Sequence, residues 1–302
     1  MQKSKVFIFG GGFIGKELLS GINKYLKRGQ ISTFEPIIVE GQIHSQKDAE
    51  KILAATRTEH GEPFAIINAI GKKGSPNVDW CEEHKEETYF SNVVVPMFLA
   101  EVAWKNRQAF IHISSGCIFN GQGPFLPNSV PNFEDSYYSY TKAQAERELV
   151  KLQERFPISI LEIHRIRMPF TSREESGNLI TKLITYGTLV NAENSLTYVP
   201  DYTEMVAGRL RSMKRALSYT LDKPVMEIIN ATNPGSIKHS EIISMIEDVS
   251  GVKLTKTYIT PEELNNICKT PRTNCVLATS IDGIERPVDQ ALHDAITKYF
   301  QK

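Results

Sequence analysis

A glycine-rich turn near the N-terminus constrains the fold of this chain more than any other feature. Gly10, Gly12 and Gly15 form the pattern G-x-G-x-x-G directly after the apolar segment Val6 to Phe9. The segment from Phe13 to Leu26 then carries apolar residues at helical spacing. Glycines in such a strand-to-helix turn let the backbone approach a pyrophosphate, which lies at the helix N-terminus. The predicted cofactor-binding residues of this turn are Gly10, Gly12, Phe13, Ile14 and Gly15.

Strands and helices alternate through the first half of the chain. Further apolar strands are predicted at 36–39, 64–69 and 110–113, and helices at 49–55, 83–104 and 139–153. Each strand is short and apolar on both faces, which is typical of a parallel sheet covered by helices on both sides. The sequence therefore predicts an α/β fold of Rossmann type with a doubly wound parallel sheet.

The alternation loosens after Ile163, which indicates a change of organisation. We expect a NAD(P)-binding lobe at 1–163 and a smaller C-terminal lobe at 164–302. The second lobe is mainly substrate-binding, and some of its segments return to the first lobe.

The identity of the dinucleotide is less well specified. Asn68 and Ala69 end the third predicted strand and complete the predicted cofactor site, because ligands of such sheets lie at the carboxyl ends of the strands. Glu40 lies near the end of the second strand, where an acidic residue favours NAD, but Gln42 and His44 follow it. NADP(H) is the expected cofactor, and NAD(H) stays open.

The composition excludes several classes of partner. Lys+Arg and Asp+Glu both total 35 in 302 residues, and a chain with no net charge has no electrostatic footprint for nucleic acid or an anionic membrane. No apolar run approaches the roughly 18 residues that a membrane span needs. The four cysteines lack disulfide-framework spacing, and no His cluster accompanies them at zinc spacing. We therefore expect a cytoplasmic protein without a metal, for which a homodimer is the default assembly.

A tyrosine and a lysine are spaced for proton transfer. Tyr138 and Lys142 are four residues apart, so they lie on the same side of the predicted helix. A nearby ammonium lowers the pKa of a phenol, which suits Tyr138 to exchange a proton with a carbonyl oxygen. Lys142 can also reach the ribose of a nicotinamide cofactor. Both residues are therefore predicted to be catalytic and cofactor-binding.

The segment from Ile111 to Phe119 runs from a strand into a loop. Period-2 alternation places Ser115 and Cys117 on one face of it. Ser115 can hydrogen-bond the substrate oxygen that Tyr138 protonates. Cys117 is either a packing residue at a strand end or part of the site, and these residues alone leave both interpretations open.

The glycine turn, Ser115 and the pair Tyr138 and Lys142 together resemble the extended short-chain dehydrogenase/reductase superfamily. Within it, the chain resembles the bifunctional nucleotide-rhamnose synthase/epimerase-reductases, which are similar to dTDP-4-dehydrorhamnose reductases. The chain departs from that family where one residue, not two, separates Gly10 from Gly12, and where His44 replaces a usual Arg. The finer resemblance rests on these segments, in order along nearly the whole chain: Asn77-Val-Asp-Trp-Cys-Glu82, Gly116-Cys-Ile-Phe119, Tyr138-Ser-Tyr-Thr-Lys142, Arg167-Met-Pro169, Ile180-Thr-Lys182 and Asn233-Pro-Gly235.

The resemblance implies an enzyme that acts on a nucleotide sugar. It would epimerise C3 and C5 of UDP-4-keto-6-deoxy-D-glucose and reduce C4 with NAD(P)H to give UDP-L-rhamnose. Two alternatives stay open. A dTDP-4-dehydrorhamnose reductase without epimerase activity would not need Cys117 with Lys182, and a non-catalytic NAD(P)-binding regulatory subunit would need no catalysis at all.

The resemblance also implies roles for individual residues. Cys117 and Lys182 would be the two acid/bases of epimerisation, one for each face of the sugar ring. Ser115 and Tyr138 would donate hydrogen bonds to the C4 oxygen as it gains charge.

Four further residues are predicted to bind substrate. Asn77 and Asp79 would line the sugar pocket. Arg167 and Arg272 are candidates for the diphosphate, since Arg binds phosphate bidentately. Surface salt bridges are the alternative for both arginines. Asn92 is either a structural residue near the active site or a helix packing residue.

Overall fold

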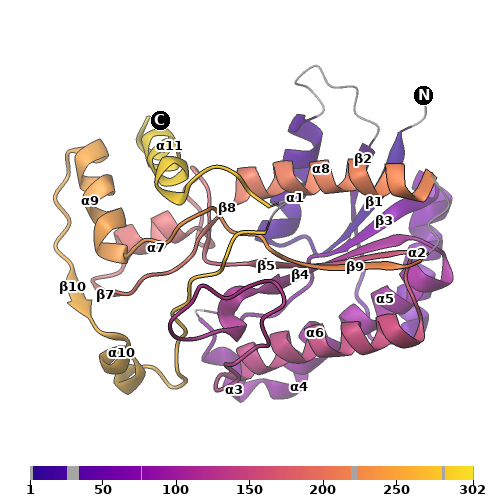
Figure 1. Ribbon diagram of the computed structural model, residues 1–302, viewed down its shortest axis with the longest axis horizontal. Helices are drawn as coiled ribbons and strands as arrows, with labels where there is room; N and C mark the ends of the chain where they lie inside the picture. The colour runs from indigo at the N-terminus through magenta and orange to yellow at the C-terminus, as the bar shows by residue number, and fades with distance from the viewer. Residues whose placement is uncertain (1–2, 26–33, 76, 219–222, 281–282, 302) are drawn as a thin grey trace.

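A six-stranded parallel sheet forms the centre of the protein, with strand order β2-β1-β3-β4-β5-β9 (Figure 1). The order reverses between β1 and β3, and open α/β sheets bind ligands at the carboxyl ends of the strands beside such a reversal. The strands are β1 (Ser4–Phe9), β2 (Phe34–Val39), β3 (Pro63–Asn68), β4 (Ala109–Ser115), β5 (Ile160–Ile166) and β9 (Val225–Asn230).

The computed structural model describes residues 3–25, 34–75, 77–218, 223–280 and 283–301. Leu26, the last residue of the first predicted helix, lies outside these ranges.

Helices cover both faces of the sheet. α1 (Phe13–Tyr25) and α8 (Val199–Ser218) pack on one face, and α2 (Gln46–His60), α5 (Val95–Lys105) and α6 (Tyr137–Arg155) pack on the other (Figure 1). The predicted α/β fold with a doubly wound parallel sheet is confirmed.

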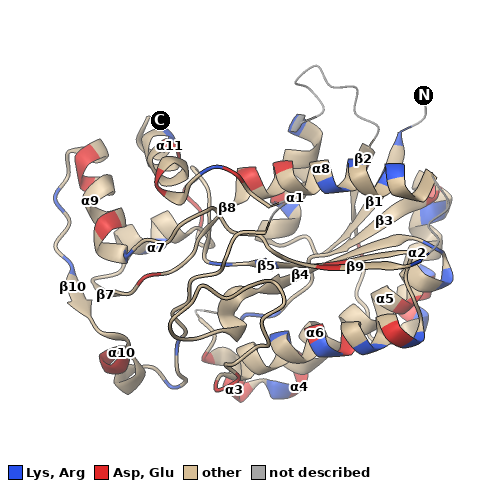
Figure 2. Cartoon of the chain, viewed as in Figure 1, with Lys and Arg blue, Asp and Glu red and all other residues tan. Residues whose placement is uncertain are grey.

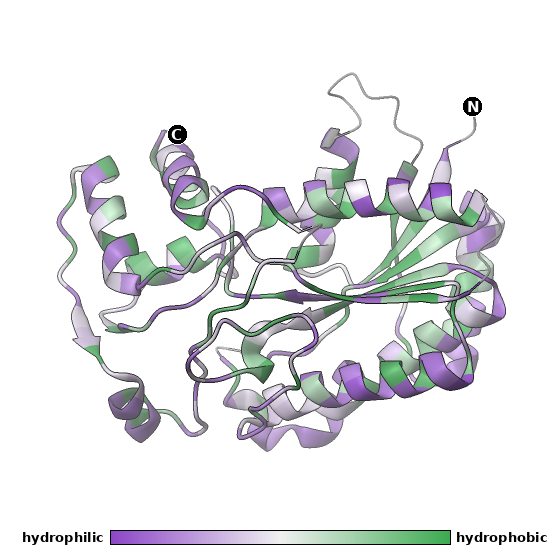
Figure 3. Cartoon of the chain, in the orientation of Figure 1, coloured by the Kyte–Doolittle hydropathy of each residue, from purple (hydrophilic) through white to green (hydrophobic). Residues whose placement is uncertain are grey.

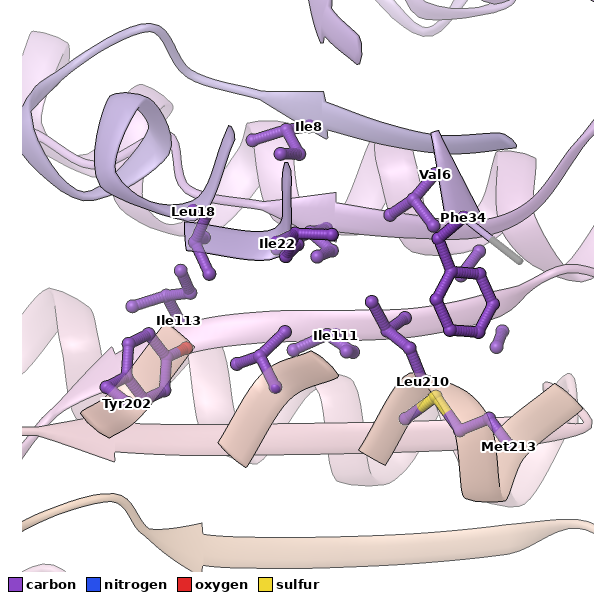
Figure 4. Close-up of a cluster of buried hydrophobic side chains, with 14 of the residues drawn as sticks. Val6, Ile8, Leu18, Ile22, Phe34, Ile111, Ile113, Tyr202, Leu210 and Met213 are labelled. Carbon is purple, nitrogen blue, oxygen red and sulfur yellow. The ribbon is translucent and has the colours of Figure 1, made fainter. Parts of the chain in front are cut away.

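The core beneath α1 and α8 follows from the periodicities of the sequence. Val6 and Ile8 alternate out of β1, and Leu18 and Ile22 share one face of α1, so the two pairs meet in one cluster (Figure 4). Tyr202 of α8 closes this cluster, and all five side chains are fully buried. Apolar residues accordingly dominate the central strands in Figure 3, whereas most charged residues lie on helices and loops in Figure 2.

A smaller lobe lies beyond the carboxyl ends of the central strands (Figure 1). α7 (Leu179–Thr185), α9 (His239–Ser250) and α11 (Val288–Phe300) enclose its separate hydrophobic core. Its short strands pair as β6 (Pro169–Phe170) with β8 (Thr197–Tyr198) and β7 (Thr188–Val190) with β10 (Thr257–Ile259), and α10 (Pro261–Ile267) follows.

The chain passes between the two lobes more than once. Both α8 and β9 follow residue 163 in the sequence, yet they belong to the sheet lobe. The lobes are therefore interleaved along the chain, and the boundary at 163 stays a prediction.

The continuous helix predicted for 83–104 is interrupted. Asn92 lies in a π-helical turn, and its side chain accepts a hydrogen bond from the backbone N–H of Lys72 (2.6 Å) and donates one to the Lys72 carbonyl oxygen (3.0 Å). A π turn inserts one extra residue and shifts the helical phase, but apolar residues keep helical spacing on either side of it, so the sequence predicts one helix. The predicted start, Glu83, is the last residue of α3 (Trp80–Glu83), and the non-helical His84 separates it from α4 (Lys85–Tyr89), the π turn η1 (Phe90–Val94) and α5.

Leu18 tests the packing of the core. Leu18→Ala removes a fully buried side chain and should lower the free energy of unfolding by about 2–5 kcal/mol, because it leaves a cavity between β1 and α8. The same substitution at Leu126, which is 52% exposed, should change it by less than about 0.5 kcal/mol. Urea denaturation of the two variants measures both values, and equal losses would contradict the placement of α1.

Candidate active site

Two glycines of the N-terminal turn have no room for a side chain. A Cβ added at Gly10, whose φ is +107°, would lie 2.6 Å from the carbonyl carbon of Ala69. A Cβ added at Gly15 would lie 1.8 Å from the carbonyl oxygen of Gly10. Both contacts are with backbone, which cannot yield as a flexible side chain does, so the turn requires glycine at these positions.

The third glycine has the opposite environment. A Cβ at Gly12 would meet no atom within 4 Å. Phe13 and Ile14 are the first two residues of α1, so open space borders Gly12 at a helix N-terminus. Backbone N–H groups at a helix N-terminus favour phosphate, and this turn fits the pyrophosphate of a dinucleotide.

A chain of buried polar side chains leads from Asn68, at the end of β3, through His112 to Lys142. Asn68 at the end of β3 accepts a bond from the Ile70 N–H (3.0 Å) through Oδ1, so its Nδ2 donates to His112 Nδ1 (3.0 Å). His112 Nε2 lies 3.4 Å from Lys142 Nζ, which donates to the carbonyl oxygen of Ile113 (2.8 Å). The chain therefore joins Asn68 and Lys142, two predicted site residues, through His112.

Burial determines the protonation states of Lys142 and His112. It lowers the pKa of Lys142 to about 8. It also lowers the pKa of His112 well below the usual range, and the nearby Lys142 lowers it further. His112 is therefore neutral at physiological pH.

The helix that carries Tyr138 and Lys142 begins at a fixed point. Ser136 is its N-cap and accepts a hydrogen bond from the Ser139 N–H (3.1 Å). Glu82 accepts a second bond from the Tyr137 N–H (2.6 Å). A carboxylate at a helix N-terminus also interacts favourably with the helix dipole. Glu82 therefore holds the first turn of α6 in position.

Tyr138 and Ser115 meet at the carboxyl end of β4. Burial raises the pKa of Tyr138, Cys117 raises it further, and a hydrogen bond with Ser115 lowers it. The expected lowering of this pKa is wrong, because burial outweighs the groups that lower it. Tyr138 therefore keeps its proton near neutral pH, which is the form that donates to a carbonyl oxygen.

Cys117 lies beside Ser115 in a short turn. Ser115 Oγ accepts a hydrogen bond from the Cys117 N–H (3.2 Å). The half-buried Cys117 Sγ in turn accepts one from Arg167 Nη1 (2.9 Å). Arg167 is only 3% exposed, so the predicted diphosphate residue is enclosed by protein and contacts Cys117.

Lys182 lies on α7 of the smaller lobe and faces another lysine. Burial lowers the pKa of Lys182, and the charge of Lys73 lowers it further. Among the described residues, no hydrogen bond joins Lys182 to Cys117. The predicted pairing of these two acid/bases stays a prediction.

Asn77, Asp79 and Arg272 form one cluster that joins the lobes. Arg272 Nη1 lies 2.8 Å from Asp79 Oδ1, and its Nη2 donates to Asn77 Oδ1 (3.3 Å). Arg272 lowers the pKa of Asp79 against the opposing effect of burial. The salt bridge expected as the alternative for Arg272 is present, and binding of a diphosphate by this residue stays a prediction.

His112 was left without a role and Lys73 was missed, whereas Asn92 was predicted to be either a structural residue near the site or a helix packing residue. His112 is a polar residue within an apolar strand, and this contrast is the sequence feature that indicates a role for it. Lys73 carried no motif, and its proximity to Lys182 depends on the tertiary fold. Asn92 also donates to Thr141 Oγ1 (3.0 Å), so it ties α6 to the loop after β3.

Comparison with known proteins establishes the family. Residues 4–211 match the family model described as RmlD substrate binding domain. The chain belongs to this family.

Its relatives include enzymes of nucleotide-sugar metabolism. The bifunctional dTDP-4-dehydrorhamnose 3,5-epimerase/dTDP-4-dehydrorhamnose reductase of Arabidopsis thaliana is 33% identical over 262 residues, which cover 84% of this chain and 81% of that protein. The L780 UDP-rhamnose synthase of Acanthamoeba polyphaga mimivirus has a similar structure, with a TM-score of 0.78, 25% identity and coverage of 98% and 99% of the two chains. A dTDP-4-dehydrorhamnose reductase of Bacillus anthracis, solved in complex with NADP, shares the fold with a TM-score of 0.74, 16% identity and 99% coverage of each chain.

Two negative observations apply to the described part of the chain. Its His, Cys, Asp and Glu side chains form no group of three or more that could hold a metal ion. None of its helices is both long and apolar enough to span a bilayer.

Lys142 provides a test of the site's electrostatics. Its ammonium is unfavourably buried below pH 8, so Lys142→Met should raise the free energy of unfolding at pH 7 by up to about 3 kcal/mol, at about 1.4 kcal/mol per pKa unit. The pKa in the folded chain lies below the ordinary value of 10.5, so wild-type stability rises between pH 8 and 10.5. The difference between the two proteins should therefore shrink over that range. Urea denaturation at pH 7 and pH 10 measures both effects.

Lys151 supplies the control for this measurement. It lies on the same helix with a side chain that is 65% exposed, so Lys151→Met should change stability by less than about 0.5 kcal/mol. If Lys142→Met is no more stable than the wild type at pH 7, the ammonium is not unfavourably buried.

Proposed function

We propose that this protein epimerises C3 and C5 of UDP-4-keto-6-deoxy-D-glucose and reduces C4 to give UDP-L-rhamnose. The observation that carries this proposal is the convergence of Ser115, Cys117 and Tyr138 at the carboxyl end of β4. A reductase alone needs Ser115 and Tyr138, but it has no use for a thiol beside them. The Arabidopsis relative, named for dTDP-linked sugars, supports the pair of activities, and the structure named as a UDP-rhamnose synthase supports the UDP-linked substrate.

The epimerase half uses the acidity of hydrogens next to a ketone. The C4 ketone of the substrate acidifies the hydrogens on C3 and C5, and Cys117 as thiolate takes one of them. The C–H electron pair moves into an enolate whose charge lies on the C4 oxygen, where Ser115 and Tyr138 donate hydrogen bonds. Return of a proton from the opposite face inverts the carbon. We assign that second face to Lys182, whose pKa is lowered toward neutrality.

The reductase half uses the same oxygen site. When bound, the nicotinamide cofactor supplies the hydride that C4 receives. Tyr138, whose raised pKa keeps it protonated, gives its proton to the C4 oxygen. One pair of donors thus serves both reactions, because negative charge develops on the same oxygen in each.

The cofactor site is proposed at the glycine turn. Gly12 offers open space for the pyrophosphate, and Asn68 and Lys142 approach the same edge of the sheet. We propose NADP(H), the dinucleotide in the Bacillus anthracis structure of the same fold, and keep NAD(H) as the alternative. Stopped-flow binding of NADPH and NADH to the same protein sample separates the two.

Tyr138→Phe tests the reductase half. It should reduce the rate of NADPH oxidation on a pre-epimerised 4-keto-L-rhamnose nucleotide by about 10²–10⁴-fold, because it removes the proton donor. Tyr140→Phe removes a hydroxyl from the same helical turn and should retain activity. Full activity of Tyr138→Phe would refute its role as acid.

Cys117→Ala tests the epimerase half. Proton NMR in D2O should show that exchange at C3 and C5 of UDP-4-keto-6-deoxy-D-glucose falls by at least about 100-fold, because the thiolate is lost. Reduction of the pre-epimerised substrate should continue, and Cys268→Ala should leave exchange unchanged.

The same assays distinguish the alternatives. Normal exchange in Cys117→Ala would remove the epimerase assignment. Reduction of the dTDP-linked sugar without any exchange by the wild type would indicate a dTDP-4-dehydrorhamnose reductase. Absence of both reactions with either nucleotide would favour the regulatory subunit.

A further inference from the structure

Arg167 occupies the point where the chain passes from the sheet lobe to the smaller lobe. It follows β5 directly, and the next residue, Met168, has a φ of +41°, which is strained for a residue with a side chain. The chain turns sharply here, and the guanidinium of Arg167 is directed at Cys117, 2.9 Å from Sγ.

The guanidinium is held by hydrogen bonds on both terminal nitrogens. Nη1 donates to Cys117 Sγ (2.9 Å) and Thr273 Oγ1 (2.8 Å). Nη2 donates to Asn194 Oδ1 (2.6 Å) and to the Thr273 carbonyl oxygen (2.5 Å). Each nitrogen carries two hydrogens, so these four bonds use all of them. Arg167 cannot turn toward a diphosphate without breaking this set.

The charges around Arg167 are unbalanced. Its three oxygen acceptors, on Thr273 and Asn194, are all neutral, and within the described ranges no carboxylate lies close enough for a salt bridge with it. Arg165, two residues earlier and equally buried, has Glu146 at 2.7 Å. A buried cation without an anion is costly, and among the described residues the Cys117 thiol is the ionisable group that accepts a hydrogen bond from Arg167.

Gly116 makes this contact possible. A Cβ at Gly116 would lie 3.3 Å from Arg167 Cδ and 2.9 Å from Leu277 Cδ1. The glycine before Cys117 therefore lets the arginine side chain pass close to the backbone and reach the sulfur.

We propose that Arg167 is a positioning residue that stabilises the thiolate of Cys117 and aims its Sγ at the sugar ring. This inference rests on the proposed function, in which Cys117 is an acid/base of epimerisation. When the thiolate takes a proton from the sugar carbon, the C–H electron pair passes to the enolate oxygen at C4 and the sulfur becomes neutral. The neutral thiol no longer pairs with the charge of Arg167, and this favours transfer of the proton from the sulfur back to the sugar carbon.

Other ionisable groups also act on Cys117. Tyr138 and Lys142 approach it from α6, and Cys275 approaches from the segment that carries Thr273. Tyr138 is protonated near neutral pH, because burial raises its pKa. The pKa of the buried Cys275 is also raised, so it is a neutral thiol. Among the described residues, Lys142 and Arg167 are cations beside Cys117, and Arg167 donates a hydrogen bond to its Sγ.

Thiolate reactivity measures the proposed effect without any turnover. In Arg167→Gln, alkylation of Cys117 by iodoacetamide at pH 7, followed by peptide mass spectrometry, should be about tenfold slower than in the wild type. Arg167→Lys restores the charge with fewer donors and should recover part of the rate. Arg57→Gln removes an arginine of α2 that pairs with Glu62 and has no part in the site, and it should alkylate at the wild-type rate.

A second variant keeps the test valid if Arg167→Gln does not fold. Asn194→Asp keeps the shape of the side chain and places a carboxylate against Arg167 Nη2. The new carboxylate then balances the positive charge of Arg167 without moving its side chain. Cys117 should therefore again be alkylated about tenfold more slowly than in the wild type. Wild-type rates in a folded Arg167→Gln or in Asn194→Asp would overturn the inference.

The result is distinguishable from failure of the proposed function. If Cys117→Ala retains exchange at C3 and C5, the assigned role of Cys117 fails, whatever the alkylation rates show. If Arg167→Gln raises the KM for the nucleotide sugar while alkylation stays at the wild-type rate, Arg167 binds the diphosphate and the positioning role is wrong.

Discussion

The hydrogen bond from Lys142 Nζ to the carbonyl oxygen of Ile113 joins α6 to β4 close to the end of the strand. It requires burial of an amine, and that burial lowers the pKa of Lys142 to about 8. The same approach of helix to strand brings Tyr138 to Ser115 and places His112 between Lys142 and the end of β3. The geometry of the candidate site therefore depends on how closely one helix packs on one strand.

The parts of this arrangement that the sequence predicts are local. The turn at Gly10, the spacing of Tyr138 and Lys142 and the position of Ser115 each follow from residues within one turn or one strand. Helical and strand periods are properties of neighbouring residues, so a sequence expresses them directly.

The parts that the sequence does not predict are contacts between distant residues. Arg167 meets Cys117 and Thr273 across separations of 50 and 106 residues. The direction of the pKa shift of Tyr138 was also predicted wrongly. Helical spacing places Lys142 on the correct side, but it does not show that Ile113 engages the ammonium or that burial dominates.

The segment from Lys269 to Cys275 has a consequence for how this enzyme family can vary. Arg272 binds Asp79 of the sheet lobe, and its neighbour Thr273 holds the guanidinium of Arg167. Cys275 then donates from Sγ to the carbonyl oxygen of Gly116 (3.3 Å). One short stretch of chain thus fixes both the junction of the lobes and the surroundings of the thiol. A one-residue insertion or deletion here shifts both sets of contacts at once, so this segment should change by substitution and keep its length.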